Sequence, residues 1–78
     1  MIDLENDRDR LQMKKIVALA HWCQNRGRYF PAIRKVATAI GTYDERVRVM
    51  LSILCAEGIL VSTITRQNRR FFKVNLDD

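Results

Sequence analysis

The sequence predicts a single α+β domain in which three helices precede a β-hairpin. Apolar residues recur at helical spacing in three segments before Gly58, and β-branched residues dominate the segment that follows it. The chain has 78 residues, of which 47% are hydrophobic, and this suffices for one small core. We therefore treat residues 1–78 as one domain.

The first helix is predicted over residues 4–26. Acidic residues between positions 3 and 9 favour the positive end of its dipole. Gly27 can adopt the left-handed conformation that ends many helices, so we expect the helix to stop there. The inward stripe follows the i, i+3, i+4, i+7 spacing and consists of Ile16, Leu19, Ala20 and Cys23.

The second helix is predicted over residues 31–40. Pro31 suits its first turn, because the amide hydrogen that proline lacks has no partner at that position. Gly41 can end the helix in a left-handed conformation. The predicted inward residues, which should pack on a neighbouring helix, are Ile33, Val36, Ala37 and Ile40.

The third helix is predicted over residues 43–57 and ends before Gly58. Thr42 and Glu45 form the T-x-x-E pattern of a capping box. This pattern predicts that the two side chains satisfy the first free amide groups of the helix. The predicted inward residues are Val47, Met50, Leu51 and Leu54.

The segment 59–75 is predicted to form a β-hairpin around a polar turn at residues 66–69. Its second strand carries Phe71 and Phe72. Adjacent strand residues point to opposite faces, so we expect one ring in the core and the other partly buried. The alternative is that these rings stack on the bases of RNA.

The charge is distributed unevenly along the chain. Lys and Arg number 14 against nine Asp and Glu, which gives a net charge of +5. Between Arg10 and Leu76 there are thirteen basic residues and three acidic ones, so this part carries +10. Such an excess is typical of a surface that binds phosphates.

Several functional classes lack their motifs in this sequence. His21, Cys23 and Cys55 do not have the spacing of a zinc site, and no phosphate-binding glycine loop or nucleophile elbow occurs. We therefore expect no metal, no cofactor and no enzymatic activity. The longest apolar run is Ile16–Ala20, against about 20 residues for a membrane span, and no secretory leader is recognisable. We expect a soluble, cytoplasmic protein without a membrane partner.

Residues 36–60 combine a small residue, two glycine turns and regularly spaced apolar residues. Ala37 is small where two helices cross, Gly41 permits a turn with positive φ, and Gly58 reverses the chain into the hairpin. Without a gap, this stretch resembles the winged helix-turn-helix pattern, with a basic hairpin where the wing belongs. It is similar to small fimbrial regulators of the PapI/FaeA type and to the cores of MarR-like repressors. Thr42 departs from the pattern, because this position is often apolar.

The resemblance implies that the third helix enters the major groove of DNA and reads base edges. Arg46 and Arg48 can each fork onto a guanine, which discriminates by about 1–3 kcal/mol. For Asp44, helix capping is the alternative to a base contact. The outward residues assigned to base reading are Tyr43, Asp44, Arg46, Arg48, Val49 and Ser52.

The resemblance also implies contacts between the wing and the DNA backbone. Four basic residues crowd the hairpin within residues 66–73, and basic residues surround the start of the second helix. The alternative for the hairpin is that its charges blunt an exposed edge strand. The residues assigned to the backbone are Arg28, Tyr29, Arg34, Lys35, Arg66, Asn68, Arg69, Arg70 and Lys73.

A second apolar line on the first helix predicts a homodimer interface, unless the hairpin or a terminus covers it. It consists of Leu4, Leu11, Ala18 and Trp22. Together these observations predict a small transcriptional regulator that binds double-stranded DNA in the nucleoid as a homodimer, with a possible protein co-regulator. The alternatives are a replication or recombination accessory factor that binds DNA, and a winged-helix adaptor that binds other proteins.

Overall fold

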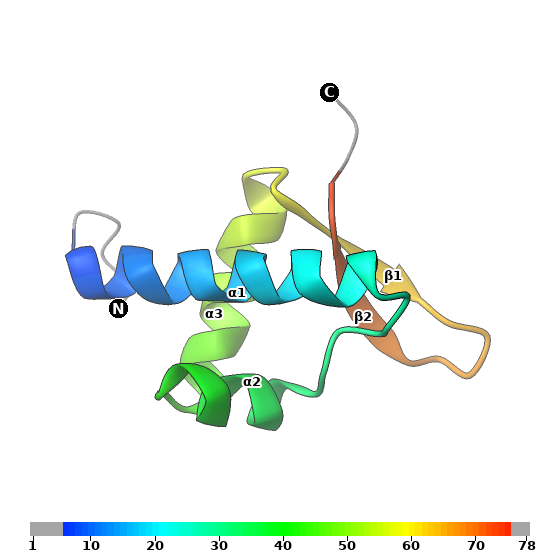
Figure 1. The fold of residues 1–78 in the computed structure, drawn as a ribbon, viewed down its shortest axis with the longest axis horizontal. Helices are drawn as coiled ribbons and strands as arrows, with labels where there is room; N and C mark the ends of the chain where they lie inside the picture. Colours follow the sequence, from blue (N-terminus) through cyan, green and yellow to red (C-terminus); the bar gives the residue numbers. More distant parts are fainter. Residues whose placement is uncertain (1–5, 76–78) are drawn as a thin grey trace.

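Three helices and a two-stranded antiparallel sheet make up the structure, a computed structural model that describes residues 6–75 (Figure 1). The predicted α+β class is confirmed, and the elements follow one another in a winged-helix layout. In chain order they are α1 (Asp7–Asn25), α2 (Ile33–Ile40), α3 (Asp44–Ala56), β1 (Leu60–Ile64) and β2 (Arg70–Val74).

Helix α1 is capped at both ends by local hydrogen bonds. The Asn6 side chain accepts a hydrogen bond from the Arg8 amide at 2.9 Å, which satisfies a free donor of the first turn. At the other end, Gly27 has φ 65°, and the Arg28 amide donates to the Cys23 carbonyl at 2.8 Å. The predicted end at Gly27 is therefore confirmed. The predicted start at residue 4 lies outside the described residues.

The starts of α2 and α3 both differ from the prediction. Ala32 is the N-cap of α2, so Pro31 precedes the helix and does not lie in its first turn. Gly41 ends α2 with φ 77°, as predicted. The Thr42 amide then donates to the Ala37 carbonyl at 2.8 Å, which makes Thr42 part of the C-terminal turn of α2.

Because Thr42 belongs to that turn, the predicted capping box does not form. The N-cap of α3 is Tyr43, which makes no capping hydrogen bond with its side chain. Two acidic residues, Asp44 and Glu45, lie in the first turn of α3 and favour the positive end of its dipole. The prediction of a helix here was right, but its capping mechanism was wrong.

The hairpin begins where Gly58 reverses the chain with φ 76°. The strands pair from Leu60↔Val74 to Ile64↔Arg70, in the antiparallel sense. In the connecting turn the Asn68 amide donates to the Thr65 carbonyl at 3.0 Å, and Asn68 has φ 61°. Asparagine tolerates this left-handed conformation better than most residues do.

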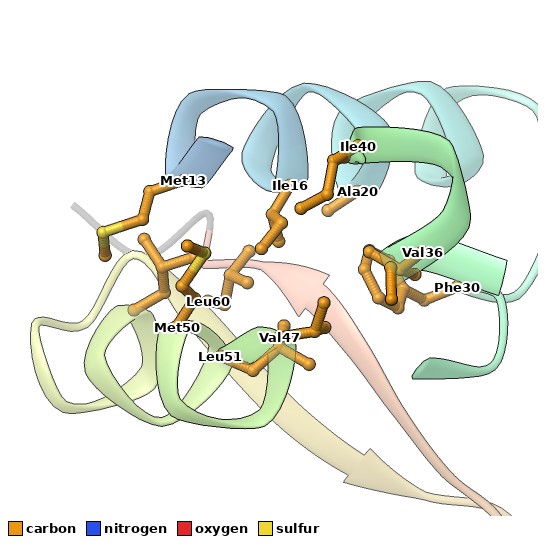
Figure 2. Packing of buried hydrophobic residues seen from close by; sticks show 12 residues of the cluster. Met13, Ile16, Ala20, Phe30, Val36, Ile40, Val47, Met50, Leu51 and Leu60 are labelled. Carbon is orange, nitrogen blue, oxygen red and sulfur yellow. The ribbon is translucent and has the colours of Figure 1, made fainter. Parts of the chain in front are cut away.

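The core lies where the three helices meet the start of the hairpin (Figure 2). Ile16 of α1, Val36 of α2 and Val47 of α3 are fully buried and join it from three sides. Leu60 closes it from β1, and Phe30 does so from the loop between α1 and α2. This core sets the position of α3 by apolar packing, which has no preferred direction.

Helix α1 crosses in front of α3 in Figure 1, and the hairpin projects beyond the helices. Strand β2 is attached to α1, because the Val74 amide donates to Oε1 of Gln24 at 3.1 Å. A groove separates α3 from the hairpin and from the loop that precedes α2. Within residues 6–75, no helix has both the length and the apolar character that crossing a membrane requires.

Candidate nucleic-acid interface

A groove of about 1060 Å³ lies between α3, the hairpin and the loop that precedes α2. It brings together residues that are far apart in the sequence. Arg48 and Ser52 border it from α3, while Arg69 and Arg70 border it from the hairpin. Tyr29 borders it from the loop. These five residues come from both predicted sets, the base-reading and the backbone-binding residues.

The groove has a positive edge. Arg48, Arg69 and Arg70 are all exposed to solvent. Among the described residues that line it, none is acidic. Three guanidinium groups around one depression produce a positive potential, which attracts a polyanion. Guanidinium groups also match the geometry of phosphate and of guanine edges.

Four of the predicted base-reading residues lie on the solvent side of α3. Tyr43 is 64% exposed at its start, and Val49, six residues further along, is 38% exposed. Arg48 and Ser52 are exposed as well. Asp44 is half-buried, and its carboxylate lies 4.0 Å from Nε of the exposed Arg34. An exposed pair at this separation contributes little to stability.

Arg46 lies elsewhere. Its side chain turns toward α1, where the guanidinium forms an ion pair with Asp9 and Nε donates to Oε1 of Gln12 at 2.8 Å. The Arg46 side chain is 16% exposed and that of Asp9 is 6% exposed, while Gln12 as a whole residue is 5% exposed. A guanidinium held in this way is not available to a base edge. We therefore remove Arg46 from the base-reading set.

The sequence interpretation missed this contact, although a signal was present. Asp9 and Gln12 are three positions apart, so they lie on the same side of a helix as the apolar stripe. Acidic residues near the start of a helix are commonly explained by the dipole, and Asp9 was explained in that way. A carboxylate on the inward side of a helix indicates a buried cationic partner instead.

The residues assigned to the DNA backbone divide into two groups. Tyr29, Arg69 and Arg70 border the groove. The others lie outside its lining, all of them exposed: Arg28, Arg34, Lys35, Arg66, Asn68 and Lys73. Arg66 and Asn68 are in the hairpin turn, whereas Arg34 and Lys35 are on α2.

Aromatic rings form the floor of the groove. Phe71 packs edge-on against Tyr29 with 4.9 Å between ring centroids, and Phe72 packs edge-on against Phe30 at 5.8 Å. Both phenylalanines are half-buried, so the prediction that one of them lies in the core was wrong. Both rings pack against the margin of the core, where each meets one ring of the loop before α2. The sequence interpretation did not anticipate the role of Phe30.

Cys55 also lines the groove, and the sequence did not point to it. Burial raises the pKa of its thiol, and the positive charge of Arg70 partly offsets that effect. A thiol with a raised pKa remains protonated at neutral pH and reacts slowly. Cys23 is buried in α1, as expected. Neither cysteine forms a disulfide.

The apolar line on α1 is partly accessible. Leu11 is 54% exposed and Trp22 is 46% exposed, and Ala18 between them is exposed too. Leu4 lies outside the described residues. Two guanidinium groups lie over the Trp22 ring, that of Arg26 at 4.6 Å and that of Arg28 at 5.6 Å from the ring centroid. This part of the line is therefore less apolar than its sequence indicates.

In the part of the chain that the structure describes, His, Cys, Asp and Glu do not gather in any group that could hold a metal ion.

The candidate site is an open, positively charged groove lined by aromatic rings. Comparisons of the chain with protein-family models, with curated proteins and with solved structures find no match.

Proposed function

We propose that this protein binds double-stranded DNA and acts as a small transcriptional regulator. One observation carries the proposal: the outer side of α3 and the hairpin contribute Arg48, Arg69 and Arg70 to one groove without an acidic residue in its described lining. The +10 charge between Arg10 and Leu76 supports it. An adaptor that binds proteins would not require such an excess of positive charge.

In this proposal α3 enters the major groove with its N-terminal half. Arg48 reaches the O6 and N7 atoms of a guanine through its guanidinium fork. Ser52, one turn further along α3, contacts a neighbouring base or phosphate. Tyr43 and Val49 complete the base-reading surface, and the thymine methyl group is the natural partner of Val49.

The hairpin holds the DNA backbone in the same proposal. Arg69 and Arg70 neutralise phosphates across the groove from α3, and Arg66 and Asn68 extend the contact at the hairpin tip. The hydroxyl group of Tyr29, in the loop before α2, donates a hydrogen bond to a phosphate. On α2, the exposed side chains of Arg34 and Lys35 supply a second backbone contact.

A single domain of this size makes few base contacts, because α3 spans only 13 residues, or about 20 Å. We therefore expect a homodimer on a two-fold symmetric site. Leu11, Ala18 and Trp22 of α1 remain the predicted interface. Binding of chromosomal or other DNA would place the protein at the nucleoid.

The test is fluorescence anisotropy with a labelled random duplex at increasing salt. We expect binding at about 50 mM salt, with an affinity that falls steeply toward physiological salt because bound phosphates release counterions. Absence of duplex binding at the low salt concentration would favour the adaptor. Preference for a single strand would favour RNA or single-stranded DNA.

Genomic footprinting of the tagged protein separates the two DNA-binding roles. A regulator would occupy symmetric sites near promoters. A replication or recombination factor would instead gather at origins or junctions. The spacing of half-sites, about 34–36 Å for one helical turn, would also test the dimer.

A further inference from the structure

A buried polar contact joins α1 to the first turn of α3, on the side of α3 that faces away from the groove. Arg46 bridges Asp9 and Gln12, which are one turn apart on α1. The residues joined by the Nε hydrogen bond are 34 positions apart in the sequence. We name Asp9, Gln12 and Arg46 the α1–α3 clamp.

Stability alone does not explain the clamp. Removing a carboxylate and a guanidinium from water is costly, and apolar residues of similar volume often make an equally stable contact. Apolar residues of both helices also share the core, where Ile16, Val47 and Met50 are fully buried. The clamp therefore adds something that these apolar side chains do not provide.

The clamp adds a constraint on the orientation of α3 relative to α1. Apolar packing tolerates a small rotation or slide of a helix, since it depends on area more than on angle. A planar guanidinium with two partners accepts a narrow range of positions. Asp9 and Gln12 sit on one face of α1, so together they define where the first turn of α3 must lie.

Two of the proposed base-reading residues, Arg48 and Ser52, are on the opposite side of the same helix. At 100° per residue, Arg48 lies about 200° and Ser52 about 240° around α3 from Arg46. A rotation of α3 by about 10° would move a side chain at a radius of about 6 Å by roughly 1 Å. Recognition sites require positioning within about 0.5 Å and 10–20°.

We infer that the α1–α3 clamp is a specificity-determining device: it sets the rotation of α3, and Asp9, Gln12 and Arg46 are positioning residues that do not touch DNA. This inference rests on the proposed function. It assigns to buried residues a share of the sequence preference of the protein, while the affinity for phosphates depends on the exposed arginines of the hairpin.

The test compares Asp9→Asn with Asp7→Asn. Both changes replace a carboxylate by an amide near the start of α1, but Asp7 is exposed and Asp9 is buried. A preferred duplex is first selected from a randomised library with the unaltered protein. The measured quantity is the ratio of its affinity to that of a random duplex.

We expect Asp9→Asn to lower this ratio about tenfold, which lies within the range that one base contact discriminates. Random-duplex affinity and its salt dependence should stay within about twofold, because no phosphate contact is lost. Asp7→Asn should leave the ratio unchanged. Arg46→Lys, which keeps the charge but not the fork, should behave as Asp9→Asn does.

An unchanged ratio in Asp9→Asn would overturn the inference, and so would an equal loss of affinity for both duplexes. If Asp9→Asn does not fold, the doubly apolar variant Asp9→Leu/Arg46→Leu replaces it, and its ratio is expected to fall as well.

A second measurement works without DNA. Residual dipolar couplings of the backbone amides report the orientation of α3 relative to α1, and we expect this orientation to change in Asp9→Asn but not in Asp7→Asn. If the unaltered protein bound no duplex, the proposed function would fail. The couplings would still decide whether the clamp orients α3.

Discussion

Arg46 and Arg48 are two residues apart on one helix, yet they belong to regions of opposite character. Arg46 lies in the buried α1–α3 contact, where Asp9 and Gln12 hold its guanidinium. Arg48 borders the open groove between α3 and the hairpin, exposed to solvent. The sequence interpretation assigned both arginines to the same role. The environment of a charged side chain, more than its residue type, therefore decides what it can bind.

The two arginines differ in where their guanidinium groups find hydrogen-bond partners. A buried guanidinium must have its partners inside the protein, because an isolated buried charge is very costly. An exposed guanidinium exchanges water for a phosphate or a base at little cost and is free to bind. One helix can therefore be anchored by one arginine and leave the next one free to bind a ligand.

The largest expected difference between the two regions is seen when each arginine is replaced by leucine in turn. Arg46→Leu removes the cation that the buried carboxylate of Asp9 faces, so we expect the free energy of unfolding to fall by about 3 kcal/mol. Arg48→Leu should change it by less than about 0.5 kcal/mol, because its side chain is exposed. Urea denaturation followed by circular dichroism measures both.

The matched control is Asp9→Leu/Arg46→Leu, which should recover most of the loss since both charges are gone. Equal stability of the two single variants would mean that the buried pair contributes no more than a surface residue.

Substitutions in α3 and in the hairpin should affect duplex binding in different ways. Arg48→Ala should reduce the preference for a selected duplex by about 1–3 kcal/mol, because a fork onto a guanine is lost. Arg69→Ala should weaken all duplexes alike and lower the salt slope by about one, because one phosphate contact is lost. Anisotropy titrations over a range of salt concentrations test both. If the two variants had the same effect on selected and random duplexes, α3 would not be reading bases.

A smaller effect is expected for the labelling rate of the Cys55 thiol, which lines the groove and is therefore sensitive to what covers it. Burial raises the pKa of this thiol, so maleimide labelling at neutral pH should be slower in the folded protein than in urea. The sign for stability follows from the same shift. Because the folded state disfavours the thiolate, this contribution is present below the pKa of the unfolded thiol and is lost as the pH rises through the folded one.

Substituting Arg70→Ala should slow the labelling further, since this charge lowers the thiol pKa. Bound duplex should also slow it by covering the groove. The buried Cys23 is replaced by alanine in all samples, so that one thiol is followed by mass spectrometry. Labelling as fast as in urea would show that the thiol is not shielded.

The smallest effect is expected for the exposed ion pair of α2 and α3. The Asp44 carboxylate is 4.0 Å from Nε of Arg34, and the Arg34 side chain is 88% exposed. Asp44→Asn should therefore change the free energy of unfolding by less than about 0.5 kcal/mol, in contrast to Arg46→Leu. A loss comparable to that of Arg46→Leu would contradict the distinction between buried and exposed pairs. Thermal melts at low and high salt measure it.

Much of the fold was predictable from the sequence because its signals are local. Gly41 and Gly58 end their helices with positive φ, as their positions predicted. The hairpin follows from β-branched residues around a polar turn. Errors occurred where two local signals competed. Thr42 has the pattern of a cap, but the glycine turn before it had already engaged its amide.

The candidate site was predictable in part. Arg48, Ser52, Arg69 and Arg70 were chosen from the sequence, and the structure brings these four to one groove. Arg46 was chosen by the same reasoning and lies elsewhere. Arg46 was assigned to the outward side because it does not belong to the apolar stripe of the helix, whereas a long side chain can reach a buried partner from the margin of a helix.

Local patterns in the sequence were enough to specify the order of the elements, the places where helices end and the excess of positive charge. These depend on backbone preferences and composition, which act within a few residues. Only the tertiary structure decided which arginines meet across the groove, which one is bound to Asp9, and that Tyr29 and Phe30 cover the rings of β2. The reason is that burial and pairing depend on how α1, α3 and the hairpin pack together, and no short stretch of sequence contains that information.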